Sequence, residues 1–558
     1  MAPQTQPPHS PDVFDDVEKK SFTDQHLELA EDEGRKAPKK HVEGNVLLLD
    51  AHGQIRLVPT PTNLPRDPLN FGKWRKAGIL LTVAWFSTMA LSVVGGFGSL
   101  APIFFGIYGK QGVAPDKIAR LLTWPSLFTG LGNFIFLPLA LVVGRRPVFL
   151  LASLLLLAAS IWGAKSGTSF ESHLAARLLQ GIAGGATESL LPLILTDMSY
   201  VHERSMYFGA YWVAQSIFTA ILNSASTYEA VYLHWTWYYW IFAILAAVGT
   251  VMILLLCPET KFARPAFAID GQLTKVDEYG NLVVLSDEEA QALGGGTGNV
   301  LQIEESERSQ SYTYMDSLSL LQPVDKSAVR VAVQSYWQML LALTNPAIVW
   351  ALGAASAVLA VTISQSLSFG SILGRVYHWQ EQNVGLVYLG ALPAAALAFL
   401  TCGWGGDKLN LWFARRNGGV HLPEHRLPSL ILPVVAGIGM FLMYGYCAQS
   451  APSTHWFSIV WSNNFATYVF ICVLINGTTY AVEAMTHNAG AALVMVVGGK
   501  NLISFGVATA IVPLSNEGKY LELMKILTGV FAGWMALGVP LYFLMPRYRQ
   551  YLADKGSK

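Results

Sequence analysis

The sequence predicts an all-α membrane protein in which twelve membrane-spanning helices form two six-helix lobes. Composition is the first observation behind this prediction, because 52% of the residues are apolar and 13% are charged, whereas soluble domains carry roughly 25% charged residues. Hydropathy is the second, since twelve apolar segments are long enough to cross about 30 Å of hydrocarbon at about 1.5 Å per residue. A polar segment, residues 258-345, separates the first six from the last six.

The expected spans follow one another along the chain with short polar connections. They cover residues 77-105, 118-142, 147-165, 172-197, 205-228, 235-257, 346-374, 383-405, 428-448, 456-478, 488-513 and 522-545. The fifth, tenth and eleventh spans are the least regular, because Gln215, Asn223, Asn463, Asn464 and Lys500 interrupt their apolar runs.

The segments outside the spans complete the expected domain organisation. The expected parts are a disordered cytoplasmic tail (1-43), a hairpin and pre-helix segment (44-76), the N-terminal lobe (77-257), a cytoplasmic central loop (258-345), the C-terminal lobe (346-545) and a cytoplasmic tail (546-558). Alternating runs at Val46 to Thr62 and at Leu273 to Ser286 predict two hairpins, which we expect to pair with each other. An amphipathic segment near Val329 to Leu341 is expected to lie on the membrane surface.

Loop charge predicts the orientation of the chain. Basic residues are concentrated in alternate loops, for example Arg145 and Arg146 after the second span and Arg415 and Arg416 after the eighth. Because basic loops stay in the cytoplasm, both termini are expected to be cytoplasmic. The N-terminal tail lacks a signal-peptide pattern, so the first span is expected to act as the insertion signal. We expect a multi-pass plasma-membrane protein, with an intracellular membrane as the alternative.

The fourth span places ionisable groups in the hydrocarbon. At 100° per residue, Gln180, Gly184 and Glu188 return to about the same helix face as Arg177. Buried charges in membranes usually face the interior of the bundle or a water-filled cavity. Arg177 and Glu188 are therefore candidates for proton coupling, or for a structural ion pair that joins helices. Glu188 is also a candidate site for a cation.

A second buried charge lies in the eleventh span, where Lys500 is expected near the middle of the membrane. It is a candidate for binding an anionic substrate or for pairing with a carboxylate. The alternative is that Gly498 and Gly499 interrupt the helix there and leave Lys500 in a water-filled gap without a specific role.

Three segments resemble signatures of the major facilitator superfamily. PLALVVGRRPV, residues 138-148, resembles the Gly-Arg-Arg loop signature, and GWGGDKLNLWFARRNGG, residues 403-419, repeats it at the corresponding place of the second half. RLLQGIAGG, residues 177-185, resembles the Arg-x-x-Gln-Gly motif that this family associates with proton coupling. The segments PRDPLNFGKWRK, RRNGGVHLPEHRLP and TTYAVEAMTHNAGAA resemble the fungal drug:proton antiporter type, in its histidinol, polyamine and cation permease-like branch.

The resemblance implies which residues form the site and the gate. It implies that Trp85, Gln365, Asn463 and Asn464 lie on helices that line the cavity. Together with Gln180, Glu188 and Lys500, from the buried polar stripe and the buried charge, these are the substrate-binding candidates. Its candidates for a cytoplasmic gate are Arg145, Arg146, Asp407, Lys408 and Glu483. The chain departs from the family pattern at two places. The first loop signature lacks its usual acidic residue, so the arginines need another acidic partner, and the fifth span lacks the Gly-Pro pair of antiporters.

Several function classes are excluded by missing motifs. The sequence has no Gly-x-x-x-x-Gly-Lys-Ser/Thr nucleotide loop and no His/Cys cluster, so we expect neither an enzyme nor a bound metal or cofactor. The expected partners are a small-molecule substrate, protons and the lipid bilayer, with no nucleic acid, and the chain is expected to be monomeric. The predicted function is proton-coupled export of a small organic compound, such as a secondary metabolite or drug, by alternating access. The alternatives are an importer of polyamines or organic cations and a non-transporting membrane sensor.

Overall fold

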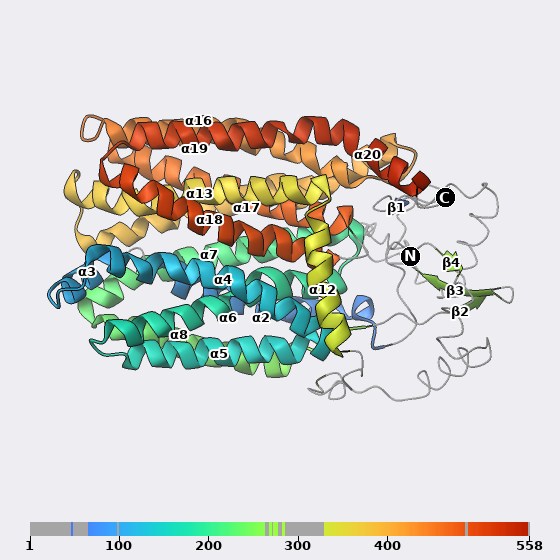
Figure 1. The fold of residues 1–558 in the computed structure, drawn as a ribbon, viewed down its shortest axis with the longest axis horizontal. Helices are drawn as coiled ribbons and strands as arrows, with labels where there is room; N and C mark the ends of the chain where they lie inside the picture. Colours follow the sequence, from blue (N-terminus) through green and yellow to red (C-terminus); the bar gives the residue numbers. More distant parts are fainter. Residues whose placement is uncertain are drawn as a thin grey trace, which may run out of the picture.

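The computed structural model describes residues 46–47, 65–96, 100–262, 267–269, 272–276, 282–284, 318, 328–485 and 489–555. Long helices run side by side in two layers, and the N-terminal layer lies beneath the C-terminal layer in Figure 1. We call the end at which α2 begins and α20 ends the tail end, and the opposite end, which carries α3, the far end.

The N-terminal lobe contains six long helices and one short helix. Its helices are α2 (Lys73–Gly95), α3 (Ala101–Gly109), α4 (Pro115–Val143), α5 (Arg145–Lys165), α6 (Phe170–Asp197), α7 (Arg204–Tyr232) and α8 (Trp235–Leu256). Short 3-10 turns, η1 (Pro68–Asn70) and η3 (Val201–Glu203), precede α2 and α7. The expected first span, 77-105, is therefore divided, because α2 ends at Gly95 and α3 is a separate helix.

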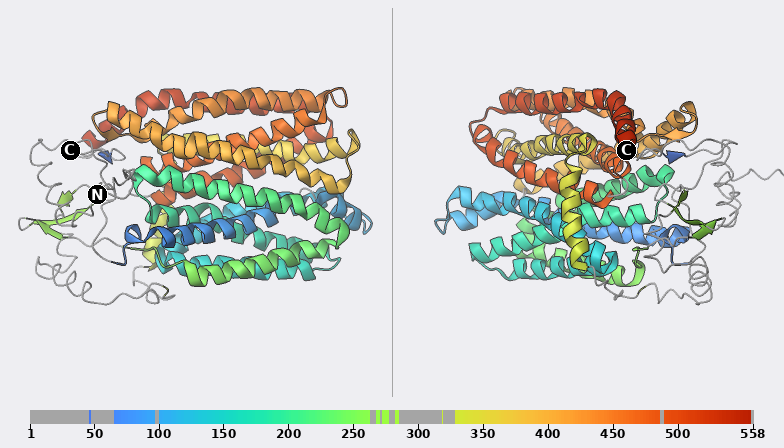
Figure 2. Two further views of the ribbon diagram at one scale, coloured as in Figure 1. Left: turned by 180° about the vertical axis from the view of Figure 1, so that it is seen from behind. Right: turned by 45° about the vertical axis from the view of Figure 1, so that its right-hand side comes forward.

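The helices of the C-terminal lobe are interrupted more often than those of the N-terminal lobe, by 3-10 and π-helical segments. It contains α13 (Pro346–Arg375), η4 (Glu381–Gly390), α14 (Ala391–Ala398), the π-helical η5 (Phe399–Trp404), α15 (Gly405–Arg416), η6 (Pro423–Leu430), α16 (Ile431–Gln449), α17 (Trp456–Ala484), α18 (Ala489–Asn516), α19 (Tyr520–Ala536) and α20 (Gly538–Lys555). Four consecutive elements, η4 to α15, together form the expected eighth span. The connecting helix α12 (Ala328–Ala342) lies across the bundle rather than along it (Figures 1 and 2).

Among the described residues, eleven helical segments are long and apolar enough to cross a membrane, where the sequence predicted twelve. The missing one corresponds to α7, which has 29 residues and is long enough but less apolar. Its polar residues, such as Gln215 and Asn223, are buried. This pattern follows from the position of α7, whose polar side is covered by packing against η4, α14, η5 and α17 of the other lobe, whereas Phe218 and Ile221 on α7 remain exposed.

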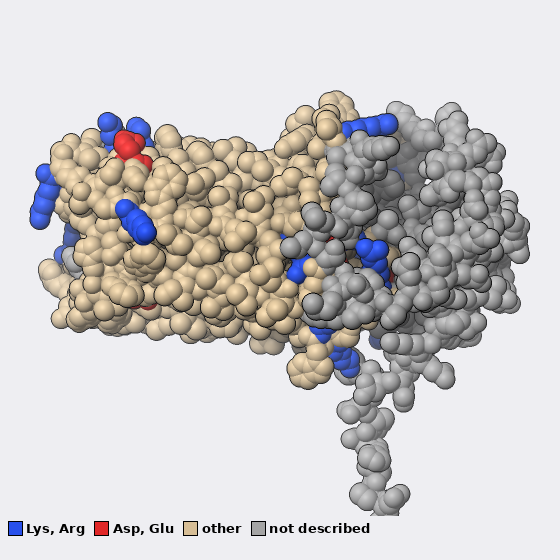
Figure 3. Space-filling view, turned by 90° about the horizontal axis from the view of Figure 1, so that it is seen from below, with Lys and Arg blue, Asp and Glu red and all other residues tan. Residues whose placement is uncertain are grey.

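On the face seen in Figure 3, the charged side chains at the surface lie toward the two ends of the molecule, with a belt almost free of charge between them. This distribution matches a bundle that crosses a bilayer, in which ionisable groups on the outer surface are costly. The two lobes meet along α4 and α18 and around α7.

The strands differ in part from the expected pair of hairpins. Strands β3 (Gln272–Val276) and β4 (Leu282–Val284) pair antiparallel as predicted, and β2 (Phe267–Ile269) adds a third strand. In contrast, β1 (Val46–Leu47) pairs with β5 (Val420–His421) after the eighth span, with Val46 opposite His421. The expected pairing of the two hairpins is therefore wrong for the described strands, and the remainder of the run up to Thr62 lies outside the described residues.

Candidate functional site

The two lobes are joined in the interior of the bundle by an ion pair between Glu188 on α6 and Lys500 on α18. Glu188 is 5% exposed and Lys500 is 1% exposed. The other carboxylate oxygen of Glu188 accepts hydrogen bonds from the amides of Asn501 and, at 3.3 Å, of Asn133 on α4. We call Asn133, Glu188, Lys500 and Asn501 the central cluster.

Local contacts hold the central cluster in place. The Asn133 amide also donates to the Thr129 carbonyl at 3.0 Å, and the Lys500 ammonium donates to the Asn501 side chain at 3.2 Å. Gly185 allows α6 to approach α4 closely, because a Cβ at this position would lie 2.5 Å from the backbone nitrogen of Asn133. This close packing brings the Asn133 side chain within reach of Glu188. The sequence identified Glu188 and Lys500 but missed both asparagines, whose only signal was their position as polar residues in apolar runs.

The alternative in which Glu188 and Arg177 form a structural ion pair is wrong, because Glu188 forms its ion pair with Lys500. Eleven residues separate Arg177 and Glu188 on α6, which corresponds to about 16 Å along a helix. The guanidinium of Arg177 instead donates to the backbone carbonyls of Val93, Val94 and Leu121. Arg177 therefore joins the end of α2 and the body of α4 to α6 within the N-terminal lobe.

The remaining candidates for substrate binding are distributed among different contacts. Trp85 donates to the Leu245 carbonyl at 3.0 Å, so its indole points into its own lobe. Gln180 accepts from Arg177 at 3.2 Å. Asn464 donates to the carbonyls of Val387 and Val460 at 3.0 and 2.8 Å and so fastens η4 to α17.

Gln365 on α13 differs from these residues. It is fully buried, and neither atom of its side-chain amide forms a hydrogen bond within the described part of the chain. Asn463 is also buried, beside Asn464 on α17. A buried polar group without a partner is costly, so Gln365 has unused capacity to bind a polar group of a ligand.

A second charged group lies at the tail end, where Arg426 of η6 forms ion pairs with Glu483 of α17 and, at 3.3 Å, with Asp407 of α15. Arg426 also contacts the Ser205 hydroxyl of the N-terminal lobe, and Asp407 accepts from the Met206 backbone N–H at 2.8 Å. We call Asp407, His421, Arg426 and Glu483 the tail cluster. It joins the two lobes at this end.

His421 completes the tail cluster and lies 3.1 Å from the Glu483 carboxylate. Burial lowers the pKa of His421 below its ordinary value, and this effect outweighs the opposite effect of Glu483. Strand β5 carries His421, so the pairing of β1 with β5 lies directly beside the cluster.

The five candidates for a gate therefore belong to separate groups. Asp407 and Glu483 join the tail cluster, and Glu483 lies in the last turn of α17 rather than in a loop. Lys408 lies over the Trp404 ring at 3.8 Å. Arg145 pairs with Asp197 at 3.1 Å inside the N-terminal lobe.

The first loop signature acquires acidic partners from elsewhere in its lobe. Glu259 accepts from the backbone N–H groups of Arg145 and Arg146 at 3.0 and 3.2 Å, and the Arg146 guanidinium donates to the Leu254 carbonyl at 2.7 Å. The expectation that these arginines use another acidic partner is confirmed for the Arg145 side chain, which pairs with Asp197, whereas Glu259 binds the backbone of both residues.

At the far end the lobes are joined by neutral hydrogen bonds. Thr227 of α7 donates to the Gln382 carbonyl at 2.9 Å, and Tyr228 donates to the Asn383 side chain at 2.8 Å. The described structure thus has contacts between lobes at the tail end, in the middle and at the far end. It represents a closed conformation.

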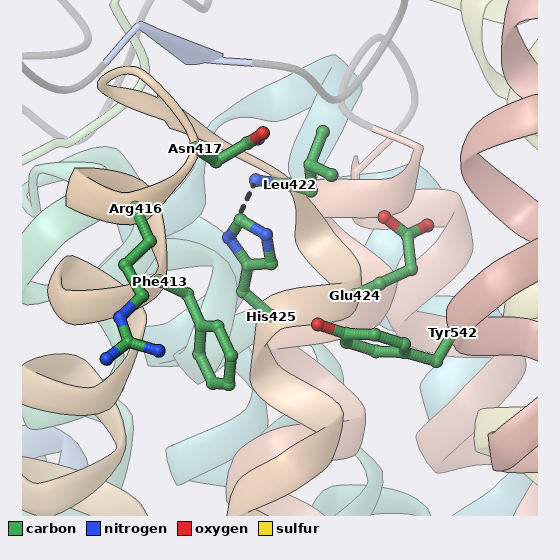
Figure 4. Close-up of a pocket in the computed structure, with 7 residues that line it drawn as sticks. All are labelled: Phe413, Arg416, Asn417, Leu422, Glu424, His425 and Tyr542. Atoms are coloured by element: carbon green, nitrogen blue, oxygen red, sulfur yellow. Dashed lines mark hydrogen bonds between the residues drawn. The ribbon is translucent and has the colours of Figure 1, made fainter.

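A cavity of about 290 Å³ lies at the tail end of the C-terminal lobe, away from the central cluster. It is lined by Phe413, Arg416, Asn417, Leu422, Glu424, His425 and Tyr542 (Figure 4). Glu424 already pairs with Arg549 of α20. The cavity therefore lies beside the tail cluster, between η6 and the C-terminal helix, and is separate from the contact between lobes. Within the described residues, no group of three or more His, Cys, Asp or Glu is placed to hold a metal ion.

Comparison with known proteins places this geometry in a family. A family model described as Major Facilitator Superfamily matches residues 80–513. An uncharacterized MFS-type transporter of Schizosaccharomyces pombe is 24% identical over 538 residues, which cover 91% of this chain and 90% of that protein. A Fusarium oxysporum protein named efflux pump FUBT is 23% identical over 440 residues, covering 76% of this chain and 65% of that protein.

A solved structure shows the same fold. The proton:xylose symporter XylE, bound to 6-bromo-6-deoxy-D-glucose, matches with a TM-score of 0.50 at 14% identity, over 86% of this chain and 97% of that chain. The family match covers most of the chain, and the described helices form the corresponding two-lobed bundle. The chain therefore belongs to the Major Facilitator Superfamily and is a transporter rather than an enzyme.

Proposed function

We propose that this transporter exports a small organic compound in exchange for protons, by alternating access. The observation that carries the proposal is the buried Glu188–Lys500 ion pair, which connects α6 of one lobe to α18 of the other. An ionisable pair at a lobe interface can couple a protonation event to movement of the lobes, because the pair must break when the lobes separate.

Protonation of Glu188 is the proposed coupling step. A neutral carboxyl group attracts the Lys500 ammonium far less than a carboxylate does, so uptake of one proton weakens the contact between lobes. Loss of that proton restores the carboxylate and its attraction for Lys500. Asn133 and Asn501 can hydrogen-bond to either form of Glu188 and so keep the side chain in place.

The contacts at the two ends are the proposed gates. The tail cluster closes one end through Arg426, and the Thr227 and Tyr228 hydrogen bonds close the other. The loop charges favour a cytoplasmic tail end with both termini inside. The membrane that we propose is the plasma membrane. In this arrangement the lobes correspond to residues 77-257 and 346-545, and the chain acts as a monomer with its own central site.

The export direction is supported by the likeness to a protein named as an efflux pump. The substrate site is proposed to include Glu188 and Lys500 together with Gln365, whose amide has no partner within the described residues. A ligand with both polar and apolar parts fits this combination of a buried ion pair, a free amide and apolar helices.

A second candidate, import of polyamines or other organic cations, is favoured by one feature of the same site. Lys500 is a primary ammonium group bound to Glu188, and an amine substrate carries the same group. Such a substrate would compete with Lys500 for the carboxylate.

The test uses purified protein in liposomes with an imposed proton gradient and a pH-sensitive dye inside. Neutral, acidic and cationic compounds, spermidine among them, are added one at a time. Proton flux with neutral or acidic compounds is the expected result. Proton flux with spermidine alone would favour cation transport over export. If compounds of the panel are transported but none of them causes proton flux, proton coupling is contradicted.

A further inference from the structure

Helix α12 lies across the long helices near the tail end, at an angle to the bundle axis that is clear in Figure 1 and in the right-hand view of Figure 2. It packs on α4 of the N-terminal lobe and on α18 of the C-terminal lobe. Its buried residues, Ser335, Met339 and Ala342, face this seam. Two of the three are small, so α12 lies close against both lobes.

The opposite face of α12 is strongly apolar and exposed. Val329 is 77% exposed, Val333 is 63% exposed and Trp337 is 61% exposed. Tyr336 and Leu340 are also exposed. At 100° per residue these five side chains fall on one side of the helix, roughly opposite the buried set. A soluble linker helix that packs on a protein would show the reverse pattern, with its apolar face inward.

The surroundings of this face indicate what covers it. On the two helices beneath, Leu131 and Ile135 of α4 and Ile503 of α18 are exposed apolar side chains of membrane-spanning segments. The apolar face of α12 extends this surface toward the tail end. Arg330 and Gln334 lie at the edge of the face, where an interfacial helix places polar groups beside lipid headgroups.

We propose that the outward face of α12 is seated in the boundary between headgroups and acyl chains of the tail-end leaflet, and that α12 thereby acts as a lipid-anchored brace across the α4–α18 seam. These two helices carry Asn133 and Lys500, which bind Glu188 from opposite lobes. Anchoring in lipid resists displacement of α12, so the brace favours the closed seam. This inference does not depend on the substrate or on proton coupling.

The depth of the face is tested with nitroxide labels on the full chain in phosphatidylcholine–phosphatidylethanolamine liposomes. Single cysteines replace Val333, Trp337 and Leu340, and the four native cysteines are buried. Collisions with oxygen, which concentrates in lipid, should exceed those with a water-soluble nickel chelate at all three positions. Frequent nickel collisions would place the face in water, and low collision rates with both reagents would mean that another segment of the chain covers it. Either outcome would overturn the proposal.

The brace is tested with two variants that add the same charge to neighbouring exposed positions, Trp337→Glu on the apolar face and Gln334→Glu at its edge. Distances are measured between labels at Lys73 and Arg415, which are exposed at the tail end of opposite lobes. Trp337→Glu should shift the population toward longer distances, and Gln334→Glu should leave it near that of the parent. If the two variants give the same distance distribution as the parent in liposomes, α12 is not a brace.

Discussion

The buried ion pair of Glu188 and Lys500 has a desolvation cost that bears on its role. Removing two charges from water has a desolvation cost of several kcal/mol per ion, and the attraction between them offsets that cost only when geometry and additional hydrogen bonds are favourable. Asn133 and Asn501 supply such hydrogen bonds to the carboxylate. A pair of this kind is a poor means of stabilising a bundle, which is why we assign it to coupling.

Removal of one partner should be much worse than removal of both. Lys500→Met leaves the buried Glu188 without its cation, and we expect a loss of about 3–5 kcal/mol of unfolding free energy. The double variant Lys500→Met/Glu188→Gln should recover most of that loss. Unfolding in denaturant in a fixed detergent measures both, and a double variant less stable than Lys500→Met would refute the pairing.

Arg177 has a structural role that its position in the sequence did not reveal. Its guanidinium reaches three backbone carbonyls with donors on three separate nitrogens, whereas an ammonium concentrates its donors on one nitrogen atom. Arg177→Lys should therefore lower the unfolding free energy by about 2 kcal/mol or more, since hydrogen bonds to charged groups contribute roughly 1.5–3 kcal/mol each. The matched control is Arg120→Lys on α4, whose side chain lies over Trp124. Equal stability of the two variants would indicate that the carbonyl contacts contribute little.

At the scale of elements, η6 connects the lobes because it carries Arg426 between α15, α17 and the start of α7. Arg426→Ala removes the contact with Ser205 and leaves Asp407 and Glu483 without their shared cation. We expect longer distances between labels at Lys73 and Arg415 in this variant and in Arg426→Lys. The lysine variant keeps the positive charge and so serves as the test if Arg426→Ala does not fold. Arg416→Ala, at an exposed position of α15, is the control. Unchanged distances in both Arg426 variants would show that the tail cluster is not a gate.

The short strand β5 makes the tail end sensitive to acid. The pKa of His421 is lowered by burial, so the native protein binds fewer protons there than the unfolded chain does once the pH falls below about 6.5. Stability from neutral His421 is thus present above this pH and is lost as the pH falls. Glu483, Arg426, His425 and Arg549 surround the ring.

The acid sensitivity is measured as the denaturant midpoint between pH 7.5 and 5. His421→Asn should flatten the decline of the midpoint on acidification, whereas His378→Asn, outside the cluster, should not. A parent protein whose midpoint rises toward pH 5 would contradict the assigned direction. The result is independent of transport.

Elements were predictable where the bilayer alone decides their pattern. Eleven of the twelve spans expected from long apolar runs correspond, within the described residues, to helical segments long and apolar enough to cross a membrane, because hydrocarbon demands about the same helix length everywhere. The sequence could not separate α2 from α3, and it could not foresee the π-helical η5 in the eighth span. Both features depend on how neighbouring helices pack and on which groups hydrogen-bond to the backbone N–H and C=O groups at these breaks. The polar α7 is the converse case, since packing against the other lobe buries polar residues such as Gln215 and Asn223.

At the scale of the whole molecule, the two lobes were predictable but their contacts were not. Glu188 and Lys500 are 312 positions apart in the sequence, and no local pattern links them. Each residue could be suspected separately, because each is a charge in an apolar run. Arg426 carries no local signal beyond that of a basic residue between two spans, because its partners come from three other elements.

The central claim is that protonation of Glu188 couples proton movement to transport. The most direct test compares Glu188→Gln with Glu171→Gln, which makes the same chemical change at the exposed start of α6. In proteoliposomes, each variant is assayed for exchange of a transported compound across the membrane and, separately, for proton movement with that compound. We predict that Glu188→Gln retains exchange but loses proton movement, and that Glu171→Gln keeps both. Proton-coupled transport at the parental rate in Glu188→Gln would contradict the account.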